Sequence, residues 1–279
     1  MVFGFIGSSR ANRLVRFSAK KGLIALIAMA TAAAFAQTRP LNDTGITFCG
    51  AATTGNNPTC LGTEPAGQDK NYGRDAATLA GTLPAKAGGS GGANGFDFTK
   101  IANNGSTLGA NITPPGTGAT DWACTKDNVT GLIWEVKTTS GLRGQSHKYT
   151  WYQTGSPNGN SGTPAATTGT AACETIGRCD TEKYVQDVNS AGLCGFNTGW
   201  RLPTVKELEG IVDFGGASPT IDSFYFPNTP SSYVWSSSPY AARSGFAWIV
   251  YFRGGSGGGA TSVSSLSSTL SVRLVRGGQ

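Results

Sequence analysis

Residues 199–208 read GWRLPTVKEL, and this stretch decides how the C-terminal half of the chain folds. Thr204, followed three residues later by Glu207, forms a capping box, in which each side chain bonds the backbone amide of the other residue. Pro203 blocks extension of a helix backwards from this point. Leu208 and the apolar residues after it recur at helical spacing. The sequence therefore predicts a short amphipathic helix capped by Thr204.

A second helix and several strands are predicted around this one. Residues 180–189 place three apolar side chains on one helical face, between an Asp180 cap and a stop near Gly192. β-Favouring residues alternate over 130–137, and further strand candidates follow at 233–235, 246–253 and 271–276. Two short helices followed by a meander of strands predict an α+β fold. The large apolar residues expected in its core are Trp134, Trp200, Leu202, Trp235 and Trp248.

The composition of the chain changes near residue 122. Residues 37–121 are rich in Gly, Asn, Thr and Ala, and their main apolar run is 95–101. We expect a loosely structured N-terminal region that packs onto the rest; a linker or stalk is the alternative. Residues 122–279 are predicted to form a single domain.

The first 36 residues have the three parts of a secretory signal. Five basic residues precede an apolar run from Gly22 to Ala33, and Ala34 and Ala36 are small residues two apart before the predicted cut. The run is shorter than the ~20 apolar residues that span a bilayer. We therefore expect an exported protein that is periplasmic, cell-surface or secreted, with no stable membrane span.

Removal of this signal changes the charge of the protein. Five of the 22 lysines and arginines lie in it, which leaves 17 against 16 aspartates and glutamates. A nearly neutral protein gives no reason to expect a nucleic-acid partner. No acidic residue follows Asp222, whereas four arginines do, so we expect a mildly cationic C-terminal surface. These arginines are Arg243, Arg253, Arg273 and Arg276.

Six cysteines, an even number in an exported chain, predict three disulfides. Spacing alone leaves their connectivity open. We expect two local loops and one long-range bridge, namely Cys49–Cys60, Cys173–Cys179 and Cys124–Cys194. A metal site is the alternative, but no Cys-x-x-Cys occurs and His147 is the only histidine. We therefore expect no metal and no cofactor.

Several separate motifs follow one another after residue 122. They are TGLIW at 130–134, GWRLPT at 199–204 with Glu207 and Leu208, FPN at 226–228, WSSS at 235–238 and VRLVR at 272–276. In this order they resemble the Lcl C-terminal domain family, which is named for the domain that ends a collagen-like adhesin. The resemblance implies a C-type-lectin-like domain with two short helices, a small antiparallel sheet and long irregular loops. It does not by itself imply sugar binding.

The motifs do not indicate an enzyme. Glu207 and Glu209 lie two apart on the predicted helix and so face different directions, unlike the paired carboxylates of a glycosidase. The Arg-Leu-Pro-Thr pattern is similar to that of formylglycine-generating enzymes, but these depend on reactive cysteines late in the chain, and none follows Cys194. Arg201 is expected to brace a carboxylate or carbonyls, and His147 to be a surface residue.

The segment 239–271 differs from the rest of the predicted domain. Between Ile249 and Leu270 there is no Lys, Glu, Gln, Met or Trp, the amino acids that no codon ending in cytosine encodes. An ordinary Gly/Ser loop is one interpretation. The segment also resembles the variable region that diversity-generating retroelements rewrite at the end of genes for C-type-lectin-fold proteins.

This resemblance implies which residues would vary. If Trp248, Val250 and Phe252 face the core at period two, the residues between them lie on the outer face. The ligand-binding positions expected from the pattern are Tyr240, Ala242, Arg243, Gly245, Phe246, Ile249, Tyr251, Arg253, Gly254 and Ser256.

The sequence thus supports three functional hypotheses. The first is an exported protein that binds an unknown protein or polysaccharide through this surface, because Tyr and Arg suit contact roles. The second is an adhesin for sulfated polysaccharide that uses Arg243 and Arg253. The third is an enzyme related to formylglycine generation, which we expect least.

Overall fold

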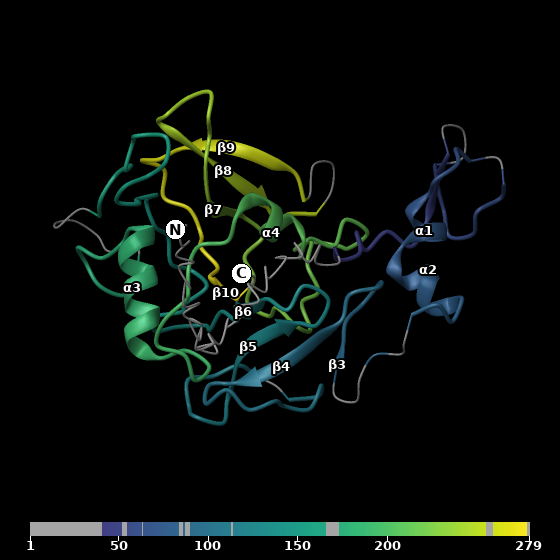
Figure 1. Cartoon of the computed structure of the whole chain (residues 1–279), viewed down its shortest axis with the longest axis horizontal. Coiled ribbons are helices and arrows are strands. Elements are labelled where there is room, and N and C mark those ends of the chain that lie inside the picture. Colours follow the sequence, from purple (N-terminus) through teal and green to yellow (C-terminus); the bar gives the residue numbers. More distant parts are fainter. Residues whose placement is uncertain are drawn as a thin grey trace, which may run out of the picture. The chain divides into compact units, whose positions relative to one another are not determined.

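Strands of the described residues form three antiparallel sheets (Figure 1). The computed structural model describes residues 41–51, 55–62, 64–83, 86, 90–112, 114–165, 173–254 and 259–277. The predicted signal segment, 1–36, lies outside them. Among the described residues, no helix has the length and apolar character needed to cross a membrane.

The largest sheet has five strands in the order β10-β6-β5-β4-β3. Their bounds are Ser90–Gly91 for β3, Phe98–Ala102 for β4, Trp122–Asp127 for β5, Ile133–Glu135 for β6 and Val275–Arg276 for β10. The pairing of β4 with β5 joins residues on both sides of position 122. The apolar run 95–101 therefore supplies a strand of the main sheet, because its Phe96, Phe98 and Ile101 side chains are buried.

A second sheet has three strands in the order β7-β8-β9, which are Tyr233–Pro239, Phe246–Tyr251 and Thr261–Ser265. The strand β9 was not predicted, because neither interpretation of the segment 239–271, an ordinary Gly/Ser loop or a variable region, placed a strand there. The C-type-lectin resemblance led us to expect one small sheet, and the described residues contain two larger ones and a two-stranded ladder.

The small ladder lies near the N-terminal end of the described chain. It consists of β1, Cys49–Ala51, and β2, Gly55–Asn57, and the Cys49–Cys60 disulfide closes it. Two short helices follow, α1 at Asp69–Tyr72 and α2 at Arg74–Leu79. The region 37–121 therefore contains regular structure that its composition did not predict.

Both predicted helices are confirmed. Helix α3 spans Thr181–Ala191, its Asp180 cap accepts a hydrogen bond from the Lys183 amide, and it ends at Gly192 in the left-handed conformation, with φ 75°. Helix α4 spans Val205–Glu209, and both hydrogen bonds of the Thr204–Glu207 capping box are present.

The core consists of two clusters of buried side chains. One joins α3 to residues of β7 and β8, and the other joins α4 to β6, β8 and the segment 221–226. Trp134, Trp200, Leu202 and Trp235 are buried as predicted. Trp248 is only half-buried, which corrects its assignment to the core.

A buried polar network joins β6 to α3 and to the segment before β10. The Glu135 carboxylate accepts hydrogen bonds from Lys137 Nζ, at 2.8 Å, from the Tyr184 hydroxyl, and from the Leu274 amide, at 2.8 Å. Burial lowers the pKa of Lys137 to about 8, although Glu135 opposes the shift. Arg273 is 2% exposed and donates to the Glu135 carbonyl oxygen. Arg273 was predicted to contribute to a cationic surface. This was wrong, because its guanidinium is buried and forms hydrogen bonds inside the domain.

All three predicted disulfides are present: Cys49–Cys60, Cys124–Cys194 and Cys173–Cys179. Cys124–Cys194 joins β5 to the loop after α3, and both cysteines are fully buried. The described fold is thus a mixed α+β arrangement braced by covalent bonds.

Candidate functional site

The residues predicted to bind a ligand lie mainly on the hairpin formed by β7 and β8. Tyr233 pairs with Tyr251, and Trp235 with Ile249, and the register shifts before Pro239 pairs with Ala247. Backbone hydrogen bonds from the Tyr240 amide to the Phe246 carbonyl, 2.8 Å, and from the Phe246 amide to the Arg243 carbonyl, 3.1 Å, close the turn. Backbone hydrogen bonds therefore help to order the turn.

Four side chains form what we term the tip cluster, Tyr240, Arg243, Phe246 and Trp248. The Arg243 guanidinium carbon lies 4.3 Å from the centroid of the Phe246 ring. The Tyr240 and Trp248 rings meet edge to face with centroids 5.2 Å apart. Arg243 is exposed and the three aromatic side chains are half-buried, so rings and a cation are offered together on one surface.

A second group, the tyrosine stack, lies at the opposite end of the hairpin. The Tyr233 and Tyr251 rings are stacked with centroids 4.2 Å apart and an interplanar angle of 19°. Arg253 Nη1 donates to the Tyr251 hydroxyl at 3.3 Å, and this hydrogen bond raises the pKa of Arg253. Tyr233 was not among the predicted contact residues; its cross-strand pairing with Tyr251 brings it there.

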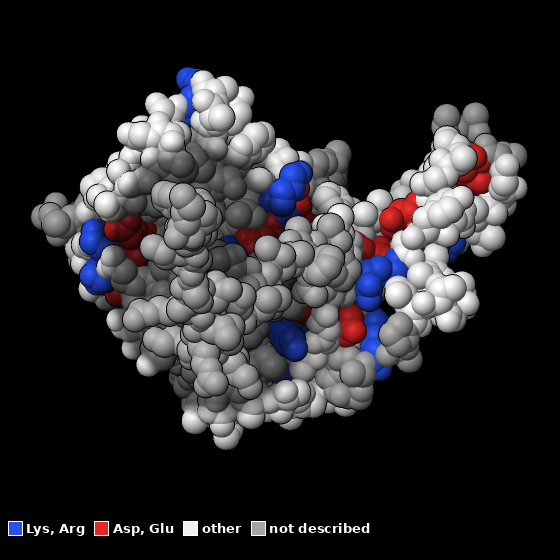
Figure 2. All heavy atoms as spheres, viewed as in Figure 1, with Lys and Arg blue, Asp and Glu red and all other residues white. Residues whose placement is uncertain are grey.

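The C-terminal arginines do not lie together in the structure. Arg243 precedes β8 and Arg253 follows it, and a strand of this length spans roughly 17 Å. Arg276 packs on the Phe196 ring, 3.6 Å from its centroid, and donates to the Thr198 carbonyl. On the face drawn in Figure 2, lysine and arginine atoms form several small separate groups and no continuous patch.

The predicted alternation of core and outer positions along β8 is wrong at Ile249. Its side chain is 4% exposed and packs with Trp235 and Leu266, whereas the neighbouring Val250 packs with Leu208 of α4. Both faces of β8 are buried at this point, because Val250 belongs to the core cluster that contains α4 and Ile249 belongs to the other core cluster. The alternation of side chains along the strand therefore does not separate exposed from buried residues at positions 249 and 250.

The two glycines predicted to vary differ in the space around them. A Cβ atom added at Gly245 would meet nothing within 4 Å, whereas one added at Gly254 would lie 2.6 Å from the Ser218 backbone nitrogen. Gly254 therefore cannot take a side chain unless the backbone moves. Ala242 is exposed in the turn, and Ser256 lies outside the described residues.

The predicted structural role of Arg201 is confirmed. Its guanidinium forms two hydrogen bonds with the Glu207 carboxylate, of 2.8 and 2.6 Å, and donates to the Leu202 and Gly277 carbonyls. Burial alone would raise the pKa of Glu207, but hydrogen bonds from Arg201 and Thr204 outweigh it and hold this pKa below its ordinary value.

Fold and surface together define a small disulfide-braced α+β domain that displays aromatic and cationic side chains on one hairpin. The chain belongs to the Lcl C-terminal domain family, whose model matches residues 123–276. Comparison with curated proteins and with solved structures gives no match.

Proposed function

We propose that the chain is an exported ligand-binding protein and that the β7–β8 hairpin is its contact surface, carried on a C-type-lectin-like scaffold. The observation that carries this proposal is the tip cluster, in which two contacting pairs, Arg243 with Phe246 and Tyr240 with Trp248, lie at the turn of the hairpin. Such residues are common at interface centres, since they offer large contact areas and directed hydrogen bonds.

The hairpin separates contact positions from scaffold positions. Ala247 and Val250 of β8 and Phe252 after it are fully buried, whereas Ala242 and Arg243 are exposed. Substitution of exposed turn residues changes stability little, whereas core substitutions cost several kcal/mol. This division suits a protein whose surface changes while its fold persists, and it supports the proposal that a retroelement diversifies the segment.

A library of the hairpin tests the contact surface directly. Ala242, Arg243, Gly245 and Phe246 are randomised together and displayed on yeast, and folded variants are sorted with an antibody against the native domain. Most variants should remain folded, and selection against a panel of purified bacterial surface proteins should yield specific binders. A matched library at Ala247, Val250 and Phe252 should lose folding. Equal loss of folding in both libraries would contradict the proposal.

Diversification is tested in the DNA. The proposal expects a near-copy of the codons for 237–279, differing only at adenines, close to a reverse transcriptase gene. Codons for Tyr240, Ala242, Arg243 and Gly245 should differ between the copies, whereas the codon for Gly254 should not. A complete genome without such a copy would remove diversification and leave the binding proposal standing.

Export is tested by mass spectrometry of the protein recovered outside the cytoplasm. The expected N-terminus is Gln37, and the mass before reduction should be lower by about six hydrogens, one pair for each of the three disulfides. Recovery of the full precursor from the cytoplasm with free thiols would contradict export.

The sulfated-polysaccharide hypothesis receives less support from the hairpin. Arg243 and Arg253 lie at opposite ends of β8, so no compact anion site results from them. Heparin chromatography tests the sulfated-polysaccharide hypothesis. If the protein is retained in a strongly salt-dependent way, and Arg243→Ala combined with Arg253→Ala abolishes this retention, the polysaccharide hypothesis is supported. The enzyme hypothesis lacks a nucleophilic thiol, because all six cysteines are paired.

A further inference from the structure

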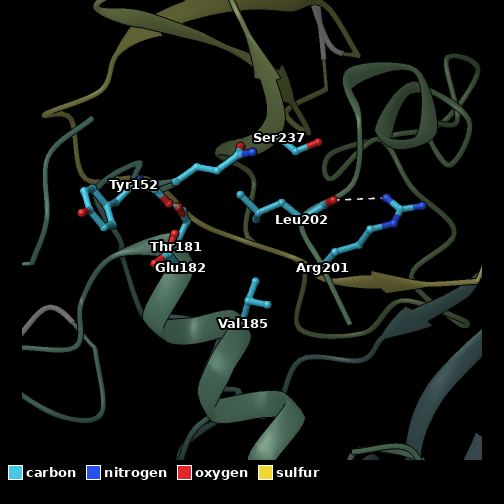
Figure 3. A pocket seen from close by; sticks show the side chains of 8 residues that line it. Tyr152, Thr181, Glu182, Val185, Arg201, Leu202 and Ser237 are labelled. Atoms are coloured by element: carbon cyan, nitrogen blue, oxygen red, sulfur yellow. Dashed lines mark hydrogen bonds between the residues drawn. The ribbon is translucent and has the colours of Figure 1, made fainter. Parts of the chain in front are cut away.

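A cavity of about 320 Å³ lies between α3, the segment before α4 and β7 (Figure 3). Its lining comprises Tyr152, Gln153, Thr181, Glu182, Val185, Arg201, Leu202 and Ser237. In Figure 3 the Val185 side chain points from α3 toward Leu202, and the Tyr152 ring lies at the edge of the space. The volume is at the small end of the range for ligand cavities, roughly 300–1,000 Å³.

Two polar side chains of the lining are available for hydrogen bonds. Neither the Gln153 amide nor the Ser237 hydroxyl has a hydrogen-bond partner among the described residues, and both side chains are half-buried. An amide both donates and accepts, and a hydroxyl does the same. These groups therefore suit a ligand with several hydroxyls at its edge.

The walls of the cavity are held in place by other contacts. The Thr181 hydroxyl donates to the Tyr152 carbonyl at 2.8 Å and accepts from the Tyr152 amide at 2.9 Å. The Ser237 amide donates to the Pro203 carbonyl at 2.7 Å. Because the site is already formed, binding does not require much ordering of the protein.

The charges of the lining disfavour an anionic ligand. Arg201 supplies a cation, but the Glu207 carboxylate already neutralises it through two hydrogen bonds. Glu182 contributes a carboxylate whose hydrogen bonds come from the amide and hydroxyl of Thr154, which are neutral groups. A sulfate or carboxylate in the cavity would meet this negative charge without a free cation to balance it.

We propose that this cavity binds a single uncharged sugar ring. The aliphatic side chains of Leu202 and Val185 would contact the apolar C–H face of the ring, and Gln153 and Ser237 would bond its hydroxyls. A zwitterionic amino acid of similar size would need a cation for its carboxylate. The cavity is separate from the tip cluster, and the proposal does not rest on the hairpin's function.

Saturation-transfer NMR with D-glucose, D-galactose and D-mannose at millimolar concentration tests the proposal on the intact protein. At least one sugar should give transfer signals, and D-glucuronate, which adds a carboxylate to the glucose ring, should bind at least about tenfold more weakly than D-glucose. Absence of signals from all three neutral sugars would overturn the proposal, as would equal binding of D-glucuronate and D-glucose.

Variants locate the bound sugar. Gln153→Ala should weaken binding about tenfold, the effect of one lost hydrogen bond, and Val185→Phe should abolish it by filling the space. Gln186→Ala, an exposed position one residue after Val185 on α3, should leave binding unchanged, as should Arg243→Ala in the tip cluster. Binding that survives both lining substitutions would overturn the cavity proposal. Should Val185→Phe fail to fold, Gln153→Ala decides alone.

Discussion

Removal of the Cys124–Cys194 disulfide should destabilise the domain more than removal of Cys173–Cys179. The two bridges close loops with sequence separations of 70 and 6 residues. The loop-entropy relation gives about 4.4 kcal/mol for the longer loop and about 2.2 kcal/mol for the shorter one at 25 °C. The expected difference in the free energy of unfolding is therefore about 2 kcal/mol, before any cost of the cavity left by buried sulfur atoms.

Urea denaturation followed by tryptophan fluorescence measures this difference, because Trp134, Trp151 and Trp235 are fully buried and become exposed on unfolding. The matched variants are Cys124→Ala with Cys194→Ala, and Cys173→Ala with Cys179→Ala. A long-loop variant that is unfolded without urea meets the expectation. Equal midpoints and slopes for the two variants, or a larger loss in the short-loop variant, would refute the reasoning.

Three further predictions concern single positions. Gly254→Val should lower the free energy of unfolding by about 1–3 kcal/mol through overpacking, whereas Gly245→Val should leave the urea midpoint nearly unchanged; a reversed order would contradict the environments of the two glycines. Glu207→Gln should cost about 1–2 kcal/mol at pH 7, because it breaks the pair with Arg201. Since the folded-state pKa of Glu207 is lowered, the pair's contribution should be lost as pH falls below about 4.5, and a wild-type advantage that persists at pH 2 would argue against it. The folded-state pKa of Lys137 is lowered to about 8 from 10.5, so the unfolded chain binds more protons between these values, and stability should rise with pH across this window; a steady fall in the urea midpoint from pH 8 to 10 would count against this origin.

Local signals in the sequence predicted local structure well. The Thr204 and Asp180 caps depend on residues three positions away, so both helices could be located without knowledge of the fold. The strand β9, Thr261–Ser265, carries a single large apolar residue, Val263, and pairs with β8 across a glycine-rich segment. Its existence depends on that pairing and not on its own pattern.

The burial of the candidate-site residues could not be predicted fully from the sequence, because it depends on contacts between residues far apart in the chain. Ile249 is buried because Trp235 and Leu266 cover the face that period two assigned to solvent. Arg273 is buried beside Glu135, which lies 138 positions earlier in the chain, and no spacing rule connects the two. The sequence could place Tyr240 and Arg243 between two predicted strands. Their role in ligand binding, which came from the resemblance to a variable region, stays a prediction.

Because β10 follows the hairpin in the chain, the main sheet can be completed only after the hairpin has been synthesised. Leu274 and Val275 fill the core, and the amide of Leu274 bonds the buried Glu135 carboxylate. A truncated chain that ends within the hairpin lacks these residues. Its main sheet has no β10 at the edge, and the buried Glu135 carboxylate lacks the Leu274 amide as a hydrogen-bond partner. A frameshift or stop codon between 237 and 270 therefore costs the domain these contacts, whereas a substitution there leaves β10 and its partners in place.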